Sequence, residues 1–161
     1  MKFEEISISE TLRIRELEID EIEQAFPVIS QLRTHLGLDE YVALVKTMKS
    51  SGYQVICLFE CEKIVSYAGI AKLVNLYYGN HIWVYDLVTD KAKQGSGYGK
   101  LLLSHIEKFA EDNLLNCVAL SSGLQREGAH KFYEKTMNYN KVSYVFKKDL
   151  RHADPTKNPV K

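Results

Sequence analysis

One stretch decides the fold: Asp90-Lys-Ala-Lys-Gln-Gly-Ser-Gly-Tyr-Gly-Lys100. It follows an almost continuous apolar and aromatic run over residues 81–90, and it precedes apolar residues at helical spacing over residues 102–110. Three glycines at alternate positions leave main-chain N–H groups uncovered, and the start of a helix adds a partial positive charge. The stretch therefore predicts a loop that holds a phosphate or diphosphate group. The alternative interpretation is a loop that needs glycine only to turn sharply.

Two well-known phosphate motifs do not fit this loop. A P-loop would need glycine in place of Gln94 and serine or threonine in place of Leu101. A dinucleotide-binding G-x-G-x-x-G motif that began at Gly95 would need glycine in place of Lys100. About 20 residues further on, where that motif has an acid for the ribose, the sequence reads Val118-Ala-Leu120. Both motifs are excluded.

The sequence before the loop predicts strands and helices in turn. A strand is expected over residues 11–17, followed by a helix with Asp20 as its N-cap that Pro27 must kink or split. A second helix is expected to begin at Asp39 as its N-cap. Strand periodicity then predicts a hairpin over residues 53–74 with its turn at Glu62-Lys63.

The run over residues 81–90 predicts a central strand, and residues 94–121 predict a β-α-β crossover. A last helix is expected over about residues 125–137, and Asn138 is suited to a left-handed C-cap. A strand over residues 139–148 is expected to close the fold.

This order of elements, with no internal repeat and no linker, predicts an α/β fold. It further predicts a single domain over residues 1–150, and a flexible tail over residues 151–161 because that segment has two prolines and no apolar period.

Composition excludes several classes of protein. The 161 residues are 45% hydrophobic, and 21 basic residues balance 21 acidic ones, which argues against a nucleic-acid partner. No apolar run is long enough to span a membrane, and no spacing of His, Cys and carboxylates indicates a metal. Because Cys57, Cys61 and Cys117 lie in apolar runs, we expect reduced core thiols and a cytoplasmic protein.

Two motifs together resemble one known family. Gln94-x-x-Gly97-x-Gly99, after Asp86-Leu-Val-Thr-Asp90, resembles the diphosphate-binding motif of the GCN5-related N-acetyltransferase (GNAT) family, in which Q/R-x-x-G-x-G/A receives coenzyme A. The stretch Arg126-Glu-Gly-Ala-His-Lys-Phe-Tyr-Glu-Lys135, with Met137-Asn-Tyr139 after it, is similar to the family's second signature, A-x-x-F-Y-E-K-x-G-F. The resemblance covers residues 11–148. It implies the GNAT-like (acyl-CoA N-acyltransferase) fold, a mixed and mainly antiparallel twisted sheet flanked by about four helices.

Three positions depart from the family's pattern. Asn138 replaces a glycine, which the left-handed tolerance of asparagine explains. Arg126 stands where many members have asparagine, so a contact with the cofactor there becomes charged or shifts. Lys91 replaces a frequent proline without any consequence for the chemistry.

The resemblance also implies a cofactor, acetyl-CoA, and the residues that bind it. The loop would hold the diphosphate, and two splayed strand ends would expose main-chain groups to the pantetheine arm, one of which polarises the thioester carbonyl. A solvated helix lysine remains the alternative for Lys100. The implied binding residues are Leu87, Val88, Gln94, Gly95, Ser96, Gly97, Tyr98, Gly99, Lys100, Ser121 and Arg126.

Two residues are implied to carry the chemistry. Tyr133 would give a proton to the leaving thiolate, although an aromatic pair with Phe132 can equally be core packing. Asp86 would take the proton from the attacking ammonium, directly or through water, and a salt-bridged structural role is the alternative. Tyr85 and His81 are weaker candidates for the base.

The function implied by the resemblance is an acetyl-CoA-dependent N-acetyltransferase that passes the acetyl group directly to a primary amine, since no cysteine lies at a recognisable nucleophile position. One alternative is a non-catalytic acyl-CoA sensor or assembly module of the same fold, and another is a nucleotide-binding domain. The amine acceptor, the use of longer acyl-CoAs and a homodimer are left open.

Overall fold

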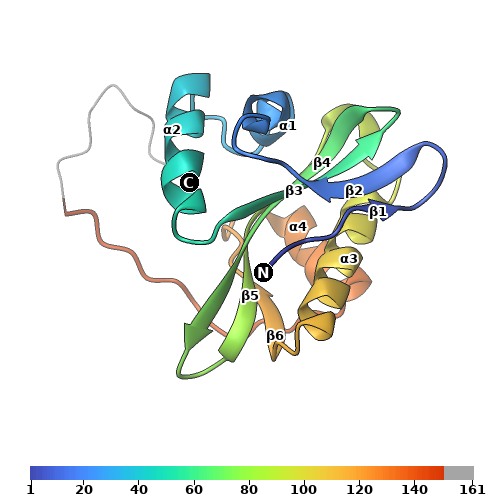
Figure 1. Cartoon of the computed structure of the whole chain (residues 1–161). Helices are drawn as coiled ribbons and strands as arrows, with labels where there is room; N and C mark the ends of the chain where they lie inside the picture. The colour runs from blue at the N-terminus through green and yellow to red at the C-terminus, as the bar shows by residue number, and fades with distance from the viewer. Residues whose placement is uncertain (151–161) are drawn as a thin grey trace. The chain divides into compact units, whose positions relative to one another are not determined.

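The computed structural model describes residues 1–150, and the chain forms two compact units that divide after Leu120. Figure 1 shows the course of the chain. The single domain expected over residues 1–150 stays a prediction, and the expected tail over residues 151–161 lies outside the described residues.

The first unit is built on a six-stranded sheet with the strand order β1-β2-β3-β4-β5-β6. Every neighbouring pair from β1 to β5 is antiparallel, whereas β5 and β6 are parallel. The predicted hairpin, crossover and mixed, mainly antiparallel sheet are therefore confirmed. The strands are β1 (Ile6–Ser7), β2 (Leu12–Glu16), β3 (Gln54–Glu60), β4 (Lys63–Asn75), β5 (Gly79–Thr89) and β6 (Cys117–Leu120).

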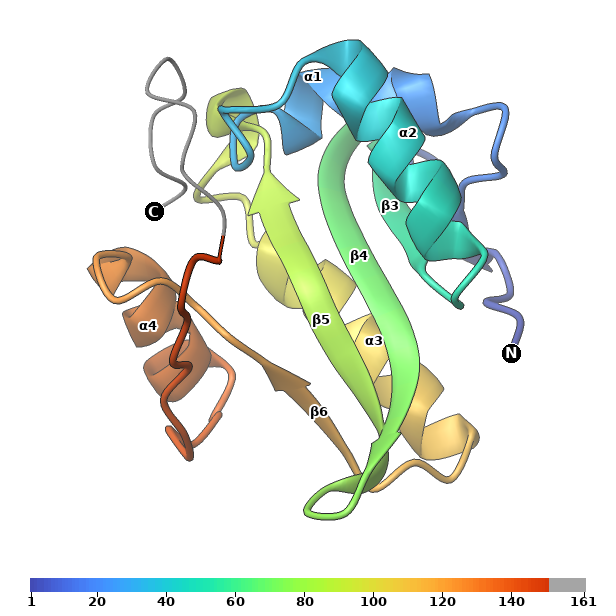
Figure 2. The ribbon, with the colours of Figure 1, turned by 90° about the vertical axis from the view of Figure 1, so that its left-hand side faces the viewer.

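Helices cover both faces of this sheet. In Figure 2, α1 (Phe26–Ile29) and α2 (Leu38–Lys49) lie in front of the strands, and α3 (Tyr98–Asp112) lies behind them. A 3-10 turn (Ile22–Ala25) precedes α1, and Pro27 occupies the first turn of α1, where a proline is tolerated. The predicted split at Pro27 is confirmed.

The two N-caps predicted for these helices are wrong by one or two residues. Glu21 precedes the 3-10 turn in place of Asp20, and Gly37 precedes α2 in place of Asp39. Neither residue caps with its side chain. These short helices are stabilised by packing, so their ends need not coincide with the best capping residue.

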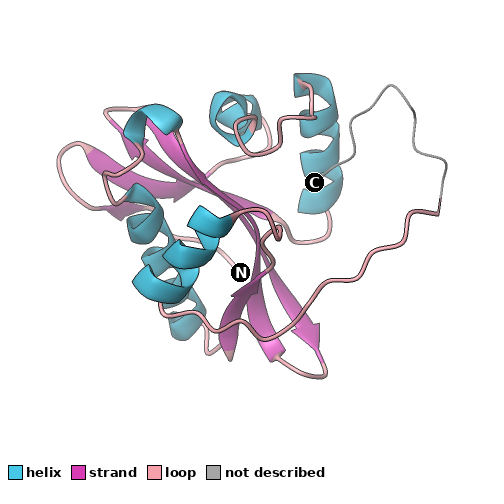
Figure 3. Ribbon diagram, turned by 180° about the vertical axis from the view of Figure 1, so that it is seen from behind, coloured by secondary structure: helices cyan, strands magenta, loops and turns pink. Residues whose placement is uncertain are grey.

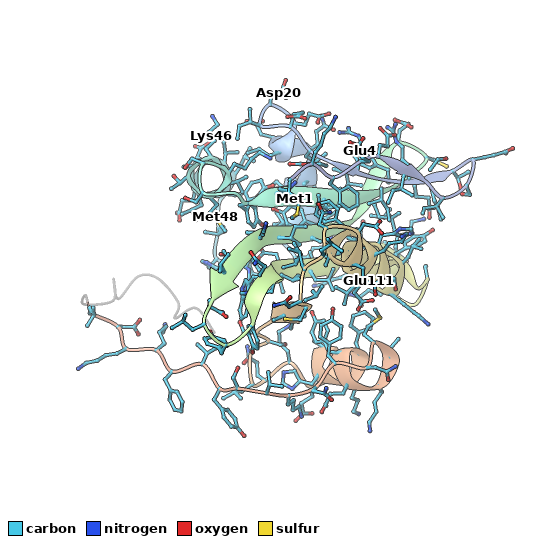
Figure 4. All side chains as sticks on the ribbon, turned by 60° about the horizontal axis from the view of Figure 1, so that its bottom comes forward. Met1, Glu4, Asp20, Lys46, Met48 and Glu111 are labelled. Carbon is cyan, nitrogen blue, oxygen red and sulfur yellow. The ribbon has the colours of Figure 1, made fainter. Side chains whose placement is uncertain are left out.

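The core consists of two apolar layers that share strand β3. Val55, Cys57 and Phe59 belong to the buried cluster of α1 and α2. The alternate residues Ile56 and Leu58 are also fully buried and face the α3 side. Burial on both faces explains why β3 reads as a continuous apolar run. Figure 4, in which Lys46 marks α2 and Glu111 marks α3, shows the side chains of both helices meeting the sheet from opposite sides.

The turn between β3 and β4 corrects the prediction for one cysteine. Its two residues, Cys61 and Glu62, have φ values of 47° and 66°, as a tight type I′ hairpin requires. Cys61 is therefore exposed, Cys57 is buried and Cys117 is half-buried. The prediction of core thiols is wrong for Cys61, and the turn lies one residue earlier than predicted.

The second unit, over residues 121–150, contains the predicted last helix. Helix α4 (Glu127–Lys131) continues into a π-helical turn (Phe132–Thr136). Asn138 then adopts φ 59°, which confirms the predicted left-handed C-cap. Figure 3 shows this short helical segment and the loop that follows it.

The strand predicted over residues 139–148 is wrong, because these residues have no regular secondary structure. The segment has the alternating composition of a strand, and its Val142, Tyr144 and Phe146 are 69%, 80% and 93% exposed. A strand is stable only when a neighbour satisfies its main-chain groups. No strand within residues 1–150 pairs with this segment.

A β-bulge interrupts the pairing of β4 with β5. Gly69 pairs with Asp86 and Ile70 pairs with Val84, so Tyr85 is the extra residue. The Tyr53 side chain, which lies outside this ladder, approaches the main chain of Gly69 closely. A Cβ at position 69 would lie 1.8 Å from the Tyr53 hydroxyl oxygen. The bulge and this close approach together need glycine at position 69.

We predict that Gly69→Ala lowers the free energy of unfolding by about 1–3 kcal/mol, because the new methyl group must displace the buried Tyr53 ring. Denaturant unfolding measures the change. The control is Gly128→Ala in α4, where a Cβ meets nothing within 4 Å and stability should be unchanged or slightly higher. A Gly69→Ala protein as stable as the wild type would contradict this account.

Candidate functional site

The glycine loop connects β5 to α3. It begins with a short 3-10 turn (Lys91–Lys93), which Asp90 caps by accepting a hydrogen bond from the Ala92 amide at 3.1 Å. Gly95 and Gly97 have φ values of 85° and 79°, a region that residues with a side chain rarely adopt. A Cβ at either position would meet no atom within 4 Å, so the space beside the loop is open.

On this open side, several main-chain N–H groups of the loop and of the start of α3 have no acceptor within the helix. Gly97 is the N-cap of the 15-residue helix α3 and has no side chain to cap it. The N–H groups of the first helical turn, which include those of Tyr98, Gly99 and Lys100, have no acceptor within the helix. Gln94, Gly95 and Ser96 are exposed beside them. These donors and the positive end of the helix dipole suit an anionic group such as a diphosphate.

Glu60, the last residue of β3, holds the loop at two points. Its carboxylate accepts a hydrogen bond from Lys93 Nζ at 2.6 Å and another from the Tyr98 hydroxyl. These two donors lower the pKa of Glu60 from its ordinary value. Because Lys93 and Tyr98 flank residues 94–97 of the loop, the contacts with Glu60 let β3 fix the loop's position.

A second contact ties the loop to the segment after α1. Gln31 Nε2 donates to Asp90 Oδ1 at 3.2 Å, and the Lys91 amide donates to Gln31 Oε1 at 2.9 Å. Hydrogen bonds from the Ala92 amide and from Gln31 lower the pKa of Asp90. The loop is therefore held by side chains from two separate parts of the first unit.

Strands β5 and β6 separate before β5 ends. Their parallel ladder stops at the pair Val84 and Leu120, whereas β5 continues to Thr89 along β4. From Tyr85 onward, no strand of residues 1–150 pairs with the second edge of β5. This separation leaves one edge of β5 without a strand partner after Val84, as the resemblance implied.

Alternation along β5 identifies which main-chain groups face the open edge. The Asp90 amide donates to the Val65 carbonyl oxygen at 2.9 Å, so Asp90 faces β4. Main-chain groups of successive residues in such a ladder point to opposite sides. Val88 and Asp86 therefore face β4 as well, and Leu87 faces the open edge, as Thr89 does.

Asp86 forms the ion pair that the sequence analysis left as an alternative. Arg33 Nε donates to Asp86 Oδ1 at 2.7 Å, and Arg33 Nη2 donates to the Tyr85 carbonyl oxygen at 2.8 Å. The Tyr53 hydroxyl donates to Asp86 Oδ2 at 2.7 Å. The Asp86 side chain is only 12% exposed. The carboxylate is thus paired on both oxygens, and Asp86 belongs to the part of β5 that has no pairing with β6.

Sequence reasoning missed Arg33 and Tyr53. Arg33 lies between α1 and α2, and Tyr53 directly precedes β3, so only the tertiary fold brings them to Asp86. The one available signal was the carboxylate itself, because an acid in a buried strand needs partners. That signal does not say which residues provide them.

Tyr133 lies in the second unit, and its side chain is buried. Its ring contacts Phe132 and Tyr139 with centroid distances of 5.3 and 6.0 Å. Burial raises the pKa of Tyr133, so its hydroxyl keeps its proton at neutral pH. Arg126 precedes α4, and Ser121 is exposed directly after β6.

Neither a membrane-spanning helix nor a metal cluster is found within residues 1–150. No helix there is long and apolar enough to cross a membrane. No group of three or more His, Cys, Asp or Glu side chains within these residues is arranged to hold a metal ion.

A mixed sheet that splays beside a glycine loop at the start of a helix is the arrangement that the resemblance implied for an acyltransferase. Comparisons with known proteins agree, since the pattern of the Acetyltransferase (GNAT) family matches residues 14–139. The uncharacterized N-acetyltransferase YhdJ of Bacillus subtilis is 35% identical over 132 residues, which cover 81% of this chain and 93% of that protein. The chain therefore belongs to the GNAT family.

Solved structures share the fold at lower identity. An aminoglycoside acetyltransferase from an uncultured soil metagenomic sample matches with a TM-score of 0.75 and 20% identity, over 90% of this chain and 100% of that chain. The aminoglycoside N-acetyltransferase AAC(6')-Iy, solved in complex with CoA, matches with a TM-score of 0.76 and 10% identity, over 91% and 100% of the two chains. These likenesses confirm the predicted fold.

We predict a pH-dependent contribution of Glu60 to stability. Because the folded pKa of Glu60 is lowered, its contribution is present above the ordinary value of 4.5 and is lost as the pH falls through the folded value. The wild type should melt at a higher temperature than Glu60→Gln at pH 7, and this gap should narrow below about pH 4.5.

Melting temperatures measured from pH 7 down to pH 3 test this expectation. Glu4→Gln is the control, because Glu4 is exposed and no ion pair involving it is found within residues 1–150. A gap for Glu60→Gln that stays constant over the whole range would show that the carboxylate does not hold the loop by its charge.

Proposed function

We propose that this GNAT-family acyltransferase moves the acetyl group of acetyl-CoA directly to a primary amine. The observation that carries the proposal is the glycine loop, whose two left-handed glycines and free helix-start donors suit the diphosphate of coenzyme A. The CoA complex of a protein with the same fold supports this choice of donor. The reduced cysteines are consistent with a reaction in the cytoplasm.

The proposal assigns the diphosphate to the loop and the helix start. The residues concerned are Gln94, Gly95, Ser96, Gly97, Tyr98, Gly99 and Lys100. Ser121 and Arg126 remain proposed contacts of the cofactor, and they rest on the motif alone. The exposed position of Lys100 on the first turn of α3 is compatible with its role.

The pantetheine arm is assigned to the open edge of β5. The sequence assigned this role to Leu87 and Val88. Alternation supports Leu87 but directs the main-chain groups of Val88 toward β4, so we assign Thr89 in place of Val88. The Leu87 amide is the proposed donor to the thioester carbonyl oxygen, where negative charge develops in the transition state.

The ammonium first gives one proton to Asp86, directly or through water, and the free amine nitrogen then forms a bond to the acetyl carbon while the carbon–sulfur bond breaks. The leaving thiolate takes a proton from Tyr133, which burial keeps protonated at neutral pH. The second proton that the nitrogen loses as the amide forms restores the Tyr133 hydroxyl, directly or through water. The roles of Asp86 and Tyr133 rest on their motif positions and on the chemistry of each group.

A specific observation favours a second candidate function, an acyl-CoA-binding module without turnover. Both oxygens of Asp86 already accept hydrogen bonds, one from Arg33 and one from Tyr53. A carboxylate that only stabilises the fold would look the same. Release of free thiol from acetyl-CoA in the presence of a panel of primary amines separates an enzyme from a sensor.

We predict that acetyl-CoA raises the melting temperature of the wild type and that Gly97→Glu abolishes this rise. Glutamate would place a side chain and a negative charge at the proposed diphosphate site. Gly52→Glu is a matched control, because Gly52 also has a positive φ and open space around it but lies between α2 and β3. An undiminished shift in Gly97→Glu would exclude the loop as the binding site.

We predict that Tyr133→Phe lowers kcat by about a hundredfold while the acetyl-CoA-induced melting shift is retained. Phenylalanine keeps the ring packing and removes only the proton donor. Thiol release with the most active amine of the panel measures kcat. Turnover equal to that of the wild type would mean that Tyr133 serves packing alone.

A further inference from the structure

Asp86 lies at one end of a buried chain of tyrosine hydroxyls. The Tyr53 hydroxyl is 2.7 Å from Asp86 Oδ2 and 3.0 Å from the Tyr67 hydroxyl. Tyr53 is 4% exposed and Tyr67 is fully buried. Tyr53 directly precedes β3 and Tyr67 lies in β4, and neither belongs to the two motifs on which the resemblance rests.

The direction of each hydrogen bond follows from the number of protons. Burial raises the pKa of Tyr53 and of Tyr67 well above the ordinary value, so both hydroxyls keep their protons. Tyr53 donates its single proton to the Asp86 carboxylate, and it can therefore only accept from Tyr67. The chain runs from Tyr67 through Tyr53 and ends on Asp86, and each bond polarises the next.

The position of the Tyr53 hydroxyl depends on Gly69. A Cβ at position 69 would lie 1.8 Å from the Tyr53 hydroxyl oxygen, and Gly69 is the strand partner of Asp86. Only a residue without a side chain lets the hydroxyl cross β4 to reach the carboxylate on β5. The ring of Tyr85, the bulged residue, packs edge-on against the Tyr53 ring at 5.7 Å.

Two other polar side chains near Asp86, Arg33 and Tyr41, differ in exposure and in their hydrogen-bond acceptors. Arg33 is a charged partner on the solvent side, with a side chain 37% exposed. Tyr41 belongs to the same buried cluster, but its hydroxyl donates to the Ile22 carbonyl oxygen at 2.9 Å and not to the carboxylate. Tyr53 is thus the buried donor to Asp86, and Arg33 is the accessible one.

We propose that Tyr53 is a positioning residue for the acetyl-transfer reaction, holding the Asp86 carboxylate from the core side in the orientation that faces the acceptor amine. The inference rests on the proposed base role of Asp86. An incoming ammonium can replace the exposed Arg33 guanidinium, since both are cations. The Tyr53 hydroxyl then keeps the carboxylate from rotating, as a neutral donor locked by packing can do.

The first test uses Tyr53→Phe and does not depend on activity. The Arg33 Nε–H group donates to Asp86 Oδ1, so its hydrogen exchange, followed by NMR, reports whether the carboxylate is held. Exchange should become about tenfold faster in Tyr53→Phe, because the carboxylate gains freedom to rotate. It should change much less in the comparison variant Tyr41→Phe, which loses a buried hydroxyl that interacts with Tyr67 but donates to the Ile22 carbonyl oxygen and not to Asp86. An unchanged exchange rate in Tyr53→Phe would overturn the proposal.

The second test measures acetyl transfer to the most active member of a panel containing tyramine, spermidine and a dipeptide. Tyr53→Phe should lower kcat by about tenfold to a hundredfold and leave the KM for acetyl-CoA unchanged. Tyr67→Phe should show the same changes to a smaller extent.

A double-mutant cycle with Asp86→Asn completes the design. If Tyr53 acts through Asp86, Tyr53→Phe should lower kcat by less than about twofold when Asp86 is already replaced. Independent, multiplying losses would overturn the proposal. If the wild type releases no thiol with any amine, the proposed function fails, while the Arg33 exchange experiment still decides whether Tyr53 holds Asp86.

Discussion

The candidate site depends on the unequal pairing of the two edges of strand β5. On one edge β5 is bound along its length to β4, and on the other it is bound to β6 only as far as Val84. Unpaired main-chain groups in a folded protein need acceptors or donors from somewhere. The open edge after Tyr85 therefore leaves main-chain groups without a strand partner, which the proposed function assigns to the pantetheine arm, and the bulge at Tyr85 turns the strand at the point where this edge begins.

The glycine loop also presents unpaired main-chain groups, here N–H donors that glycine leaves uncovered. The affinity of the proposed diphosphate site therefore depends on how well the loop is fixed. Glu60 fixes it from β3, and Gln31 fixes it from the segment after α1. A carboxylate next to the proposed diphosphate site opposes anion binding, but the ion pair with Lys93 and the hydrogen bond from the Tyr98 hydroxyl compensate the charge of Glu60. Glu60 can therefore fix the loop with little repulsion of a bound diphosphate.

Sequence patterns predicted the elements that local chemistry determines. The glycine loop, the split at Pro27, the left-handed Asn138 and the order of strands β3 to β6 follow from spacing and from turn-forming residues. The strand over residues 139–148 was predicted wrongly because a strand needs a partner, and an alternating pattern cannot show whether one exists. The exposure of Cys61 follows from hairpin register, which an apolar run does not reveal.

The surroundings of Asp86 lay beyond sequence reasoning for a different reason. Motif analysis located the acid, but its partners Arg33 and Tyr53, and the Tyr67 hydroxyl that bonds to Tyr53, come from three segments with no signal of their own. A paired buried carboxylate costs desolvation energy, and removing one of its partners costs more. A fold that only needed stability could place an apolar residue at position 86. The proposed base role of Asp86 accounts for the polar cluster and for the glycine that its geometry requires at position 69.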